Sequence, residues 1–296
     1  MAELVGAFAA SHGPLLVRAW DQIPAGQRER LSNAYHQLGK RLSAARPDVL
    51  IVVAPDHWAN FFLDHMPSVC IGVGEENEGP PEVWMKDFPH RTLQGHPGFA
   101  MHLVEQSLKN GFEPSVSHRL KLDHGFCIPL WKMGLKKLPR IVPIVVNSIE
   151  PPFPTVQRCL DWGLQIRKAV QSFRKPLRVA VLGTGGLSHS IGEKTMGAID
   201  EKLDQETIRH FSKSSAALIR FLEKKLPKAG NGTEEVRNWL LAHGAAGGRG
   251  FELIDYLSVP TVYVGCGYAA WGVTPASRRR AAPARHRSSA RRRKTS

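Results

Sequence analysis

Short runs of apolar and β-branched residues recur along the chain, and longer stretches with helical spacing separate them. The short runs lie at residues 4–9, 49–54, 69–73, 140–146, 177–182 and 261–265. They are apolar throughout and do not alternate with polar residues, which is typical of strands that are buried on both faces. These runs are therefore predicted to form the strands of an internal sheet.

The stretches between several of these strands predict helices. Apolar side chains recur at three- and four-residue spacing over residues 25–45, 97–110 and 156–173. Helix is also predicted from 201 to 256, with an interruption at 230–232. Because strands alternate with helices, we expect an α/β fold: a single three-layer α/β/α domain with a mostly parallel or mixed central sheet. Residues 74–97, which are rich in Gly and Pro, are expected to form a long loop over a site.

The charge is distributed unevenly along the chain. Its 296 residues include 40 basic and 26 acidic side chains, which gives a formal net charge of +14. Nine of the basic side chains and no acidic one fall within residues 276–296, so the remainder carries only +5. We therefore interpret residues 1–275 as the catalytic domain and residues 276–296 as a disordered basic tail. A change of reading frame is a further hypothesis for the abrupt composition of this tail.

Several classes of protein are excluded at this stage. No apolar run reaches the roughly 18 residues that a membrane-spanning helix needs, so a membrane protein is not expected. The first residues contain an acid where a signal peptide requires basic residues. The four cysteines lie far apart and form no Cys-x-x-Cys pair, which argues against disulfides and a thiolate zinc site. A cytoplasmic location is therefore expected.

Histidines follow three of the predicted strands. His12 comes after the strand at 4–9, His57 after 49–54, and His189 after 177–182. Ligands of open α/β sheets bind at the carboxyl ends of the strands, so these side chains are predicted to converge there. His124, in the loop sequence LDHGF, is a fourth candidate. A single loop histidine is more often a plain surface residue, but their coincidence at three strand ends favours metal binding and proton transfer.

Two other motifs are weak evidence for nucleotide binding or serine hydrolysis. The sequence GTGGLSH at 183–189 lacks the Lys-Ser/Thr of a phosphate-binding P-loop and the full spacing of a dinucleotide fingerprint. Ser11 and Ser188 each precede a histidine, but residues adjacent in sequence do not normally pair as nucleophile and base, and no G-x-S-x-G elbow is present. Serine hydrolysis is therefore not favoured.

Four segments taken together resemble a known enzyme family. They are SHGP (11–14), APDHWANFFLDHMPSVCIGVG (54–74), LDHGFCIPL (122–130) and GTGGLSH (183–189). In this order they resemble the class III extradiol ring-cleavage dioxygenases, over residues 5–272. The resemblance implies a non-haem Fe(II) centre held by two histidines and one glutamate.

The resemblance also implies roles for individual residues. His12 and His57 match the two histidine ligands, and Glu252, in GRGFELIDY, matches the glutamate. Asp56 and Asp123 compete with Glu252 on residue type alone. The resemblance gives His189 the role of active-site base and His124 that of a second active-site histidine, without dividing the acid and base steps between them.

The implied substrates are O2 and a catecholic acid of the protocatechuate, gallate or dihydroxyphenylpropionate type. A substrate carboxylate requires a nearby cation, and the candidates are Arg91, Arg119 and Lys121. The aromatic residues after His57 are candidates for a pocket wall or for core packing, namely Trp58, Phe61 and Phe62.

Alternative functions and partners stay open at this point. One alternative is another metal-dependent enzyme of the same fold, for example a zinc hydrolase. The other is a protein that binds nucleic acid or another polyanion through its basic tail, which is the less favoured interpretation. Whether the chain forms a homo-oligomer or requires a separate small α subunit is also open.

Overall fold

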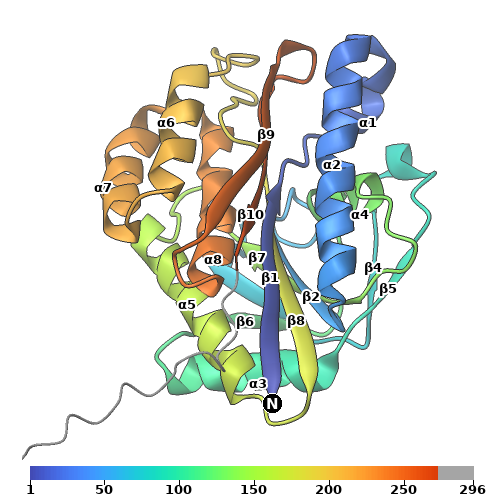
Figure 1. The fold of residues 1–296 in the computed structure, drawn as a ribbon, viewed down its shortest axis with the longest axis vertical. Helices are drawn as coiled ribbons and strands as arrows, with labels where there is room; N and C mark the ends of the chain where they lie inside the picture. The colour runs from blue at the N-terminus through green and yellow to red at the C-terminus, as the bar shows by residue number, and fades with distance from the viewer. Residues whose placement is uncertain (273–296) are drawn as a thin grey trace, which may run out of the picture.

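The computed structural model describes residues 1–272, and the predicted basic tail at 276–296 lies outside the described residues. A mixed sheet forms the centre (Figure 1). Its strands are β1 (Ala2–Ala10), β2 (Val49–Ala54), β3 (Val69–Gly72), β6 (Ser115–Ser117), β7 (Arg140–Val146), β8 (Leu177–Thr184), β9 (Phe251–Val259) and β10 (Val264–Trp271). Their order across the sheet is β6-β3-β7-β2-β8-β1-β10-β9. The central strands β7, β2, β8 and β1 run parallel, whereas β10 pairs with β1 and with β9 in antiparallel fashion.

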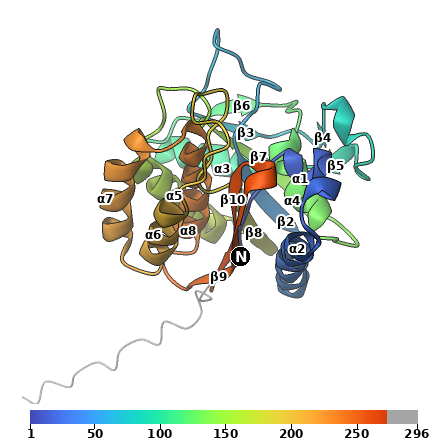
Figure 2. The same cartoon turned by 90° about the horizontal axis from the view of Figure 1, so that it is seen from above.

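Helices cover both faces of this sheet (Figure 2). On one face lie α1 (Leu15–Arg18), α2 (Ala25–Ala45) and α4 (His124–Lys132). On the other lie α3 (Pro97–Lys109), α5 (Val156–Ser172) and α8 (Val236–Ala245), with α6 (Glu201–Phe211) and α7 (Ser215–Lys225) extending that layer. Short 3-10 turns connect these elements: η1 (Trp20–Gln22), η2 (Val83–Met85), η3 (Leu226–Lys228), η4 (Asn231–Glu235) and η5 (Pro260–Val262). The expected three-layer α/β/α architecture with a mixed sheet is confirmed.

The burial of β2 explains why its sequence is apolar throughout. All six of its residues are buried. Val49, Ile51 and Val53 pack into the core beneath α3, α5 and α8, whereas Leu50, Val52 and Ala54 pack into the core beneath α2 and α4. Successive side chains of a strand point to opposite faces, so a strand covered on both sides needs apolar residues at every position.

Two predicted elements are corrected. Residues 251–256, predicted as helix, form the first part of the edge strand β9, which pairs with β10 along its length. Helix α8 ends at Ala245, and Gly247, Gly248 and Gly250 turn the chain with positive φ before β9 begins. The strand predicted at 261–265 is displaced, because η5 occupies 260–262 and β10 starts only at Val264.

The predicted loop at 74–97 contains some regular structure. A small antiparallel hairpin joins β4 (Glu76–Glu78) to β5 (Thr92–Gln94), and η2 lies between these two strands. Within the described part of the chain, none of the helices has the length and apolar character needed to cross a membrane.

Helix α8 is buried along its whole length because glycines let it approach α5 closely. A Cβ atom placed on Gly163 of α5 would lie 2.3 Å from the carbonyl oxygen of Leu241 in α8. One placed on Gly244 of α8 would lie 2.4 Å from the carbonyl oxygen of Leu160. Both positions therefore require glycine, and this contact fixes α8 and the residues just before it against the sheet.

We expect Gly244→Ala to destabilise the protein by about 1–3 kcal/mol, because the added methyl group would force α5 and α8 apart. Urea unfolding followed by circular dichroism measures the change. Gly26→Ala is the matched control, since a Cβ at this exposed helical position would meet no atom within 4 Å. The control should keep or slightly raise stability. Equal stability of the two variants would contradict the close-packing argument.

Candidate active site

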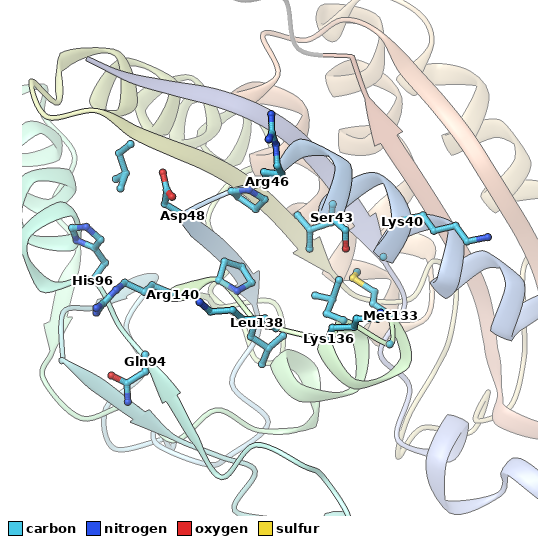
Figure 3. Close-up of a pocket in the computed structure, with 18 of the residues that line it drawn as sticks. Lys40, Ser43, Arg46, Asp48, Gln94, His96, Met133, Lys136, Leu138 and Arg140 are labelled. Atoms are coloured by element: carbon cyan, nitrogen blue, oxygen red, sulfur yellow. The ribbon is translucent and has the colours of Figure 1, made fainter.

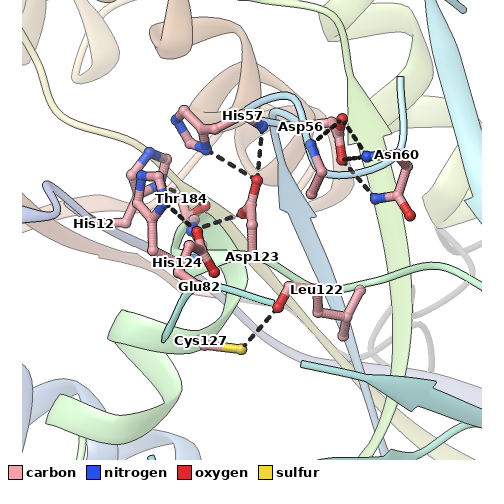
Figure 4. Close-up of polar contacts among 12 residues, drawn as sticks. His12, Asp56, His57, Asn60, Glu82, Leu122, Asp123, His124, Cys127 and Thr184 are labelled. Atoms are coloured by element: carbon pink, nitrogen blue, oxygen red, sulfur yellow. Dashed lines mark hydrogen bonds and ion pairs between the residues drawn. The ribbon is translucent and has the colours of Figure 1, made fainter. Parts of the chain in front are cut away.

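Three of the predicted histidines meet at the carboxyl ends of the parallel strands (Figure 4). His12 follows β1, His57 follows β2, and His124 is the first residue of α4. The ring centroids of His12 and His57 are 5.0 Å apart, and those of His57 and His124 are 4.1 Å apart. Ring nitrogens of all three lie within 4.8 Å of one another. Convergence of the strand ends therefore brings together residues that are widely separated in the sequence.

The carboxylate at this cluster belongs to Glu235, the last residue of η4. Its side chain is only 3% exposed. One oxygen, Oε1, lies 3.3 Å from Nε2 of His12 and 3.4 Å from Nε2 of His57. The other, Oε2, accepts a hydrogen bond from the backbone N–H of Gly186 and lies 3.8 Å from Nε2 of His189. Glu235 thus connects the two histidines predicted as ligands with the histidine predicted as base.

The structure corrects the prediction for Glu252. This residue lies on the edge strand β9 with 58% of its side chain exposed. Both of its carboxylate oxygens accept hydrogen bonds from Arg41, each at 2.6 Å. A planar guanidinium matches a carboxylate in this two-bond arrangement, so Glu252 is occupied by a surface ion pair on α2. Glu235, and not Glu252, is the glutamate that lies next to His12 and His57.

Sequence reasoning missed Glu235 because its segment interrupts a region read as helix. The available signal was the sequence GNGT at 230–233 followed by two glutamates and an apolar helix. A glycine-rich break before a buried helix often marks a turn that points side chains toward a site.

Each histidine near Glu235 is oriented by a second contact on its other ring nitrogen. Nδ1 of His12 lies 3.0 Å from the hydroxyl oxygen of Thr184, at the end of β8. Nδ1–H of His57 donates to Oδ2 of Asp123 at 3.1 Å, and the same oxygen accepts the backbone N–H of His57 at 2.7 Å. Such contacts fix the rotation of an imidazole ring, and here both Nε2 atoms face Glu235.

The two competing aspartates have other partners. Asp123 is buried, caps the first turn of α4 by accepting the N–H of Gly125, and holds His57. Asp56 accepts backbone N–H bonds from Ala59, Asn60 and Phe61, which closes the turn after β2. Figure 4 shows Asp56 turned toward Asn60, while Asp123 points at His57.

His124 is held by Glu82, from the segment at 74–97 that was predicted to cover a site. Oε1 of Glu82 accepts the Nδ1–H of His124 at 2.7 Å and its backbone N–H at 3.0 Å. The neighbouring Trp84 ring lies 5.7 Å from the His124 ring. With Nδ1 occupied in this way, Nε2 is the ring atom of His124 that is left for proton transfer.

His189 is buried next to the cluster, and its Nδ1–H donates to the carbonyl oxygen of Leu187 at 3.1 Å. Residues 230–232 cover this ring. A Cβ atom on Gly232 would lie 2.1 Å from Nε2 of His189, so only glycine leaves room for the imidazole. The segment that carries Glu235 therefore also shapes the space around His189.

The loop before His189 is fixed by a buried carboxylate. Asp204 accepts the backbone N–H and the hydroxyl of Ser188, each at 2.8 Å, and the hydroxyl of Tyr256 at 2.7 Å. Burial raises the pKa of Asp204 to about 6, although these hydrogen bonds oppose the increase. Asp204 ties helix α6 to both the His189 loop and strand β9.

Charges within the cluster shift the pKa values of its members. Burial alone would raise the pKa of Glu235, but the electrostatic influence of the neighbouring His12 and His189 and the hydrogen bonds from His12 and His57 hold it well below the usual value. Burial would lower the pKa of His57, yet Asp123 and Glu235 outweigh it and raise this pKa to about 10. Burial and the charge on His57 lower the pKa of His124. The site thus combines ionised carboxylates with imidazoles, which is the donor set of a divalent transition metal.

The residues proposed to recognise a substrate carboxylate are engaged elsewhere or exposed. Arg91 donates to the backbone carbonyls of Pro80, Met85 and Lys86, and Arg119 pairs with Glu78 on the surface. The backbone N–H of Lys121 bonds to Asn60. Of the aromatic candidates, Trp58 is 39% and Phe62 is 52% exposed, and Phe61 is partly buried against the core.

A wide hollow of about 1250 Å³ lies elsewhere, at the amino ends of β2, β7 and β8 (Figure 3). Its lining includes Asp48, Arg140 and Leu177, which stand at or just before the first residues of these strands. It contains none of the predicted site residues, which lie at the opposite ends of the strands.

Comparison with known proteins identifies the family. Residues 6–268 match the family model described as the catalytic LigB subunit of aromatic ring-opening dioxygenase. The chain belongs to this family. The family predicted from the four sequence motifs is thereby confirmed.

Relatives of this LigB-family chain carry dioxygenase names. It is 29% identical over 203 residues to a 2,3-dihydroxyphenylpropionate/2,3-dihydroxicinnamic acid 1,2-dioxygenase of Photorhabdus laumondii, covering 68% of this chain and 61% of that protein. It is 35% identical over 167 residues to a second enzyme of this name from Pseudomonas putida, covering 55% of this chain and 50% of that protein. The matches thus span only about half to three-fifths of these relatives' length.

The fold of this LigB-family chain is also found in a solved structure. An uncharacterized protein of Escherichia coli K12 superimposes with a TM-score of 0.62 at 15% identity, covering 90% of this chain and all of that one. At this identity the likeness concerns the fold alone.

We expect Gly232→Ala to lower turnover by roughly 100-fold while the protein stays folded, because the new methyl group would displace His189 and a displacement of about 1 Å at a reacting group has this cost. Steady-state kinetics and circular dichroism measure the two effects. Gly98→Ala is the control, since its Cβ would meet no atom closer than 4.0 Å. If Gly232→Ala kept full turnover, the space around His189 would not matter for the chemistry.

A second prediction concerns Asp204 and pH. Its pKa is about 6 in the folded protein against 3.8 for the free side chain, so the folded state binds more protons between pH 4 and 6. The contribution of Asp204 to stability therefore falls as pH rises through this window, by roughly 3 kcal/mol in total. Asp204→Asn removes this dependence.

Urea unfolding of both proteins at pH 4.5 and pH 7 measures the effect, because the other titrating groups cancel in the difference. The wild type should lose stability relative to Asp204→Asn as pH rises. A difference that does not change with pH would contradict the raised pKa.

Proposed function

We propose that this chain is an Fe(II)-dependent extradiol dioxygenase that inserts both atoms of O2 into a catecholic acid and opens the ring beside the diol. The observation that carries the proposal is the position of Glu235, whose Oε1 lies within 3.4 Å of Nε2 of both His12 and His57. Two imidazoles and one carboxylate form the ligand set of non-haem Fe(II) oxygenases. Membership of the LigB family and the names of the relatives support the same reaction.

In this proposal His12, His57 and Glu235 hold the metal. When bound, an Fe(II) ion with three protein ligands offers open positions to the diol and to O2 and allows electrons to pass from the ring to oxygen. The chain prepares these ligands in advance, because Thr184 and Asp123 fix the two imidazole rings and the N–H of Gly186 fixes the carboxylate.

His189 and His124 move the protons. Both donate Nδ1–H to a protein oxygen, the carbonyl of Leu187 or the carboxylate of Glu82, so each presents Nε2 toward the reaction. Nε2 can accept a proton from a diol hydroxyl and later return it to an oxygen of the opening ring. The lowered pKa of His124 favours the neutral ring, whose Nε2 lone pair can accept a hydrogen bond from a diol hydroxyl. Burial of His189 under residues 230–232 keeps water from competing for that proton.

The names of the relatives support the proposed substrate class. The named relatives act on a catechol that bears a carboxylated side chain. The reaction needs no organic cofactor, because the catechol supplies the electrons that reduce O2. The proposed partners are therefore the catecholic acid and O2.

The glutamate ligand is tested by a matched pair of variants. We expect Glu235→Ala to lose stoichiometric Fe(II) after anaerobic reconstitution and to lose at least about 100-fold in turnover, because one of three ligands is removed. Glu252→Ala removes the same side chain from an exposed ion pair and should retain both metal and turnover, with stability changed by no more than about 1 kcal/mol.

Bound iron is measured by elemental analysis, and turnover by oxygen uptake with a panel of catechols, with Zn(II) reconstitution as a parallel arm. Loss of iron in Glu252→Ala and not in Glu235→Ala would reverse the ligand assignment. Absence of oxygen uptake by the iron-loaded wild type with every catechol, or activity with Zn(II) alone, would overturn the proposed function.

A further inference from the structure

Trp84 and Arg18 extend the candidate active site in one direction. The Trp84 ring lies 5.7 Å from the ring of His124, at an angle of 50°. The guanidinium carbon of Arg18 lies over the Trp84 ring, 5.8 Å from its centroid. His124, Trp84 and Arg18 therefore form a connected series from the histidine cluster to the protein surface.

Arg18 and Trp84 lie on two short segments that also carry residues of the candidate active site. Arg18 is the last residue of α1, and it follows His12 by six positions. Trp84 belongs to η2, two residues after Glu82, which holds His124. His124 itself is the first residue of α4. The positions of Arg18 and Trp84 are thus fixed by the same segments that place the histidines.

Arg18 differs from the other cations near the site. Within residues 1–272 it forms no ion pair with a carboxylate, and its side chain is exposed. Arg91, by contrast, donates to three backbone carbonyls, and Arg119 pairs with Glu78. Arg18 therefore keeps its fork of N–H donors available for an external anion, with Trp84 restricting its orientation.

We propose that Arg18 binds the carboxylate of the catecholic acid, and that Trp84 supports the side chain that links this carboxylate to the ring. The inference rests on the proposed function, since it assumes that the diol is bound at the histidine cluster. Arg18 connects to His124 through the Trp84 ring, so we expect it to meet a carboxylate on a short side chain better than one attached directly to the catechol ring. The subsite selects catechols whose carboxylate sits at the end of a short side chain.

The contact between Arg18 and the carboxylate contributes to substrate binding and not to the reaction. A guanidinium and a carboxylate form two parallel charge-assisted hydrogen bonds, and the aromatic face next to them lowers the exposure of the pair to water. Arg18 is therefore a specificity-determining residue and not a catalytic one. Its loss should weaken binding of the acid and leave the reaction of the diol itself intact.

The test compares an acid with an uncharged analogue. The dissociation constants of 2,3-dihydroxyphenylpropionate and of 3-propylcatechol are measured anaerobically by calorimetry on the iron-loaded full chain, and kcat and KM are measured in air. For Arg18→Gln we expect a 10- to 100-fold weaker binding and a similarly raised KM for the acid, which is the usual cost of losing a charge-assisted hydrogen bond. Binding and turnover of 3-propylcatechol should change less than two-fold.

Two further variants sharpen the result. Arg18→Lys keeps the charge but loses the fork and should give an intermediate loss with the acid alone. Arg28→Gln removes a partly exposed arginine that pairs with Asp21 and should change the binding of neither ligand.

An equal loss for both ligands in Arg18→Gln would assign Arg18 a structural role, and no loss for either would place the carboxylate elsewhere. Both outcomes overturn the inference, as does failure of the wild type to prefer the acid. Anaerobic binding with the expected selectivity but without oxygen uptake would instead overturn the proposed function and leave the carboxylate subsite in place.

Discussion

The candidate site depends on one buried carboxylate that is shared by two imidazoles. Glu235 lies almost entirely out of water, and a buried carboxylate is costly unless positive charge and hydrogen-bond donors surround it. His12, His57 and the N–H of Gly186 supply these partners. The same arrangement that compensates the charge of Glu235 also gathers two nitrogens and one oxygen at a single point, which is what a divalent metal requires.

Two parts of the fold place Glu235 next to His12 and His57. His12 and His57 follow the ends of the parallel strands β1 and β2. The close packing of α8 against α5 through Gly163 and Gly244 fixes the turn before α8, which carries Glu235. Contacts further out set ring orientation. Asp123, Glu82 and Asp204 act respectively on His57, on His124 and on the loop of His189. The candidate site is therefore positioned mainly by the backbone, with carboxylates fixing the rings.

Sequence patterns predicted the layered α/β fold because strands buried on both faces must be apolar at every position, as in β2. They also found His12, His57 and His189, since parallel strands direct the residues after them to one edge of the sheet, and the loop sequence LDHGF added His124. They failed at the edge strand β9, whose apolar spacing is compatible with a helix and whose pairing with β10 decides its conformation. The net charge of the sequence was uninformative about the site, because nine of its fourteen positive charges lie in residues 276–296.

The sequence by itself determined the fold class, the family and the histidines, because these depend on periodicity and on motifs that occupy adjacent positions. Only the tertiary structure decided which carboxylate joins them. Glu235 and Glu252 have the same side chain, and the glycine-rich break before Glu235 indicates a turn there but not which other residues its carboxylate meets. Burial against His12 and His57 in one case and pairing with Arg41 in the other distinguish the two, and both result from packing between elements far apart in the chain.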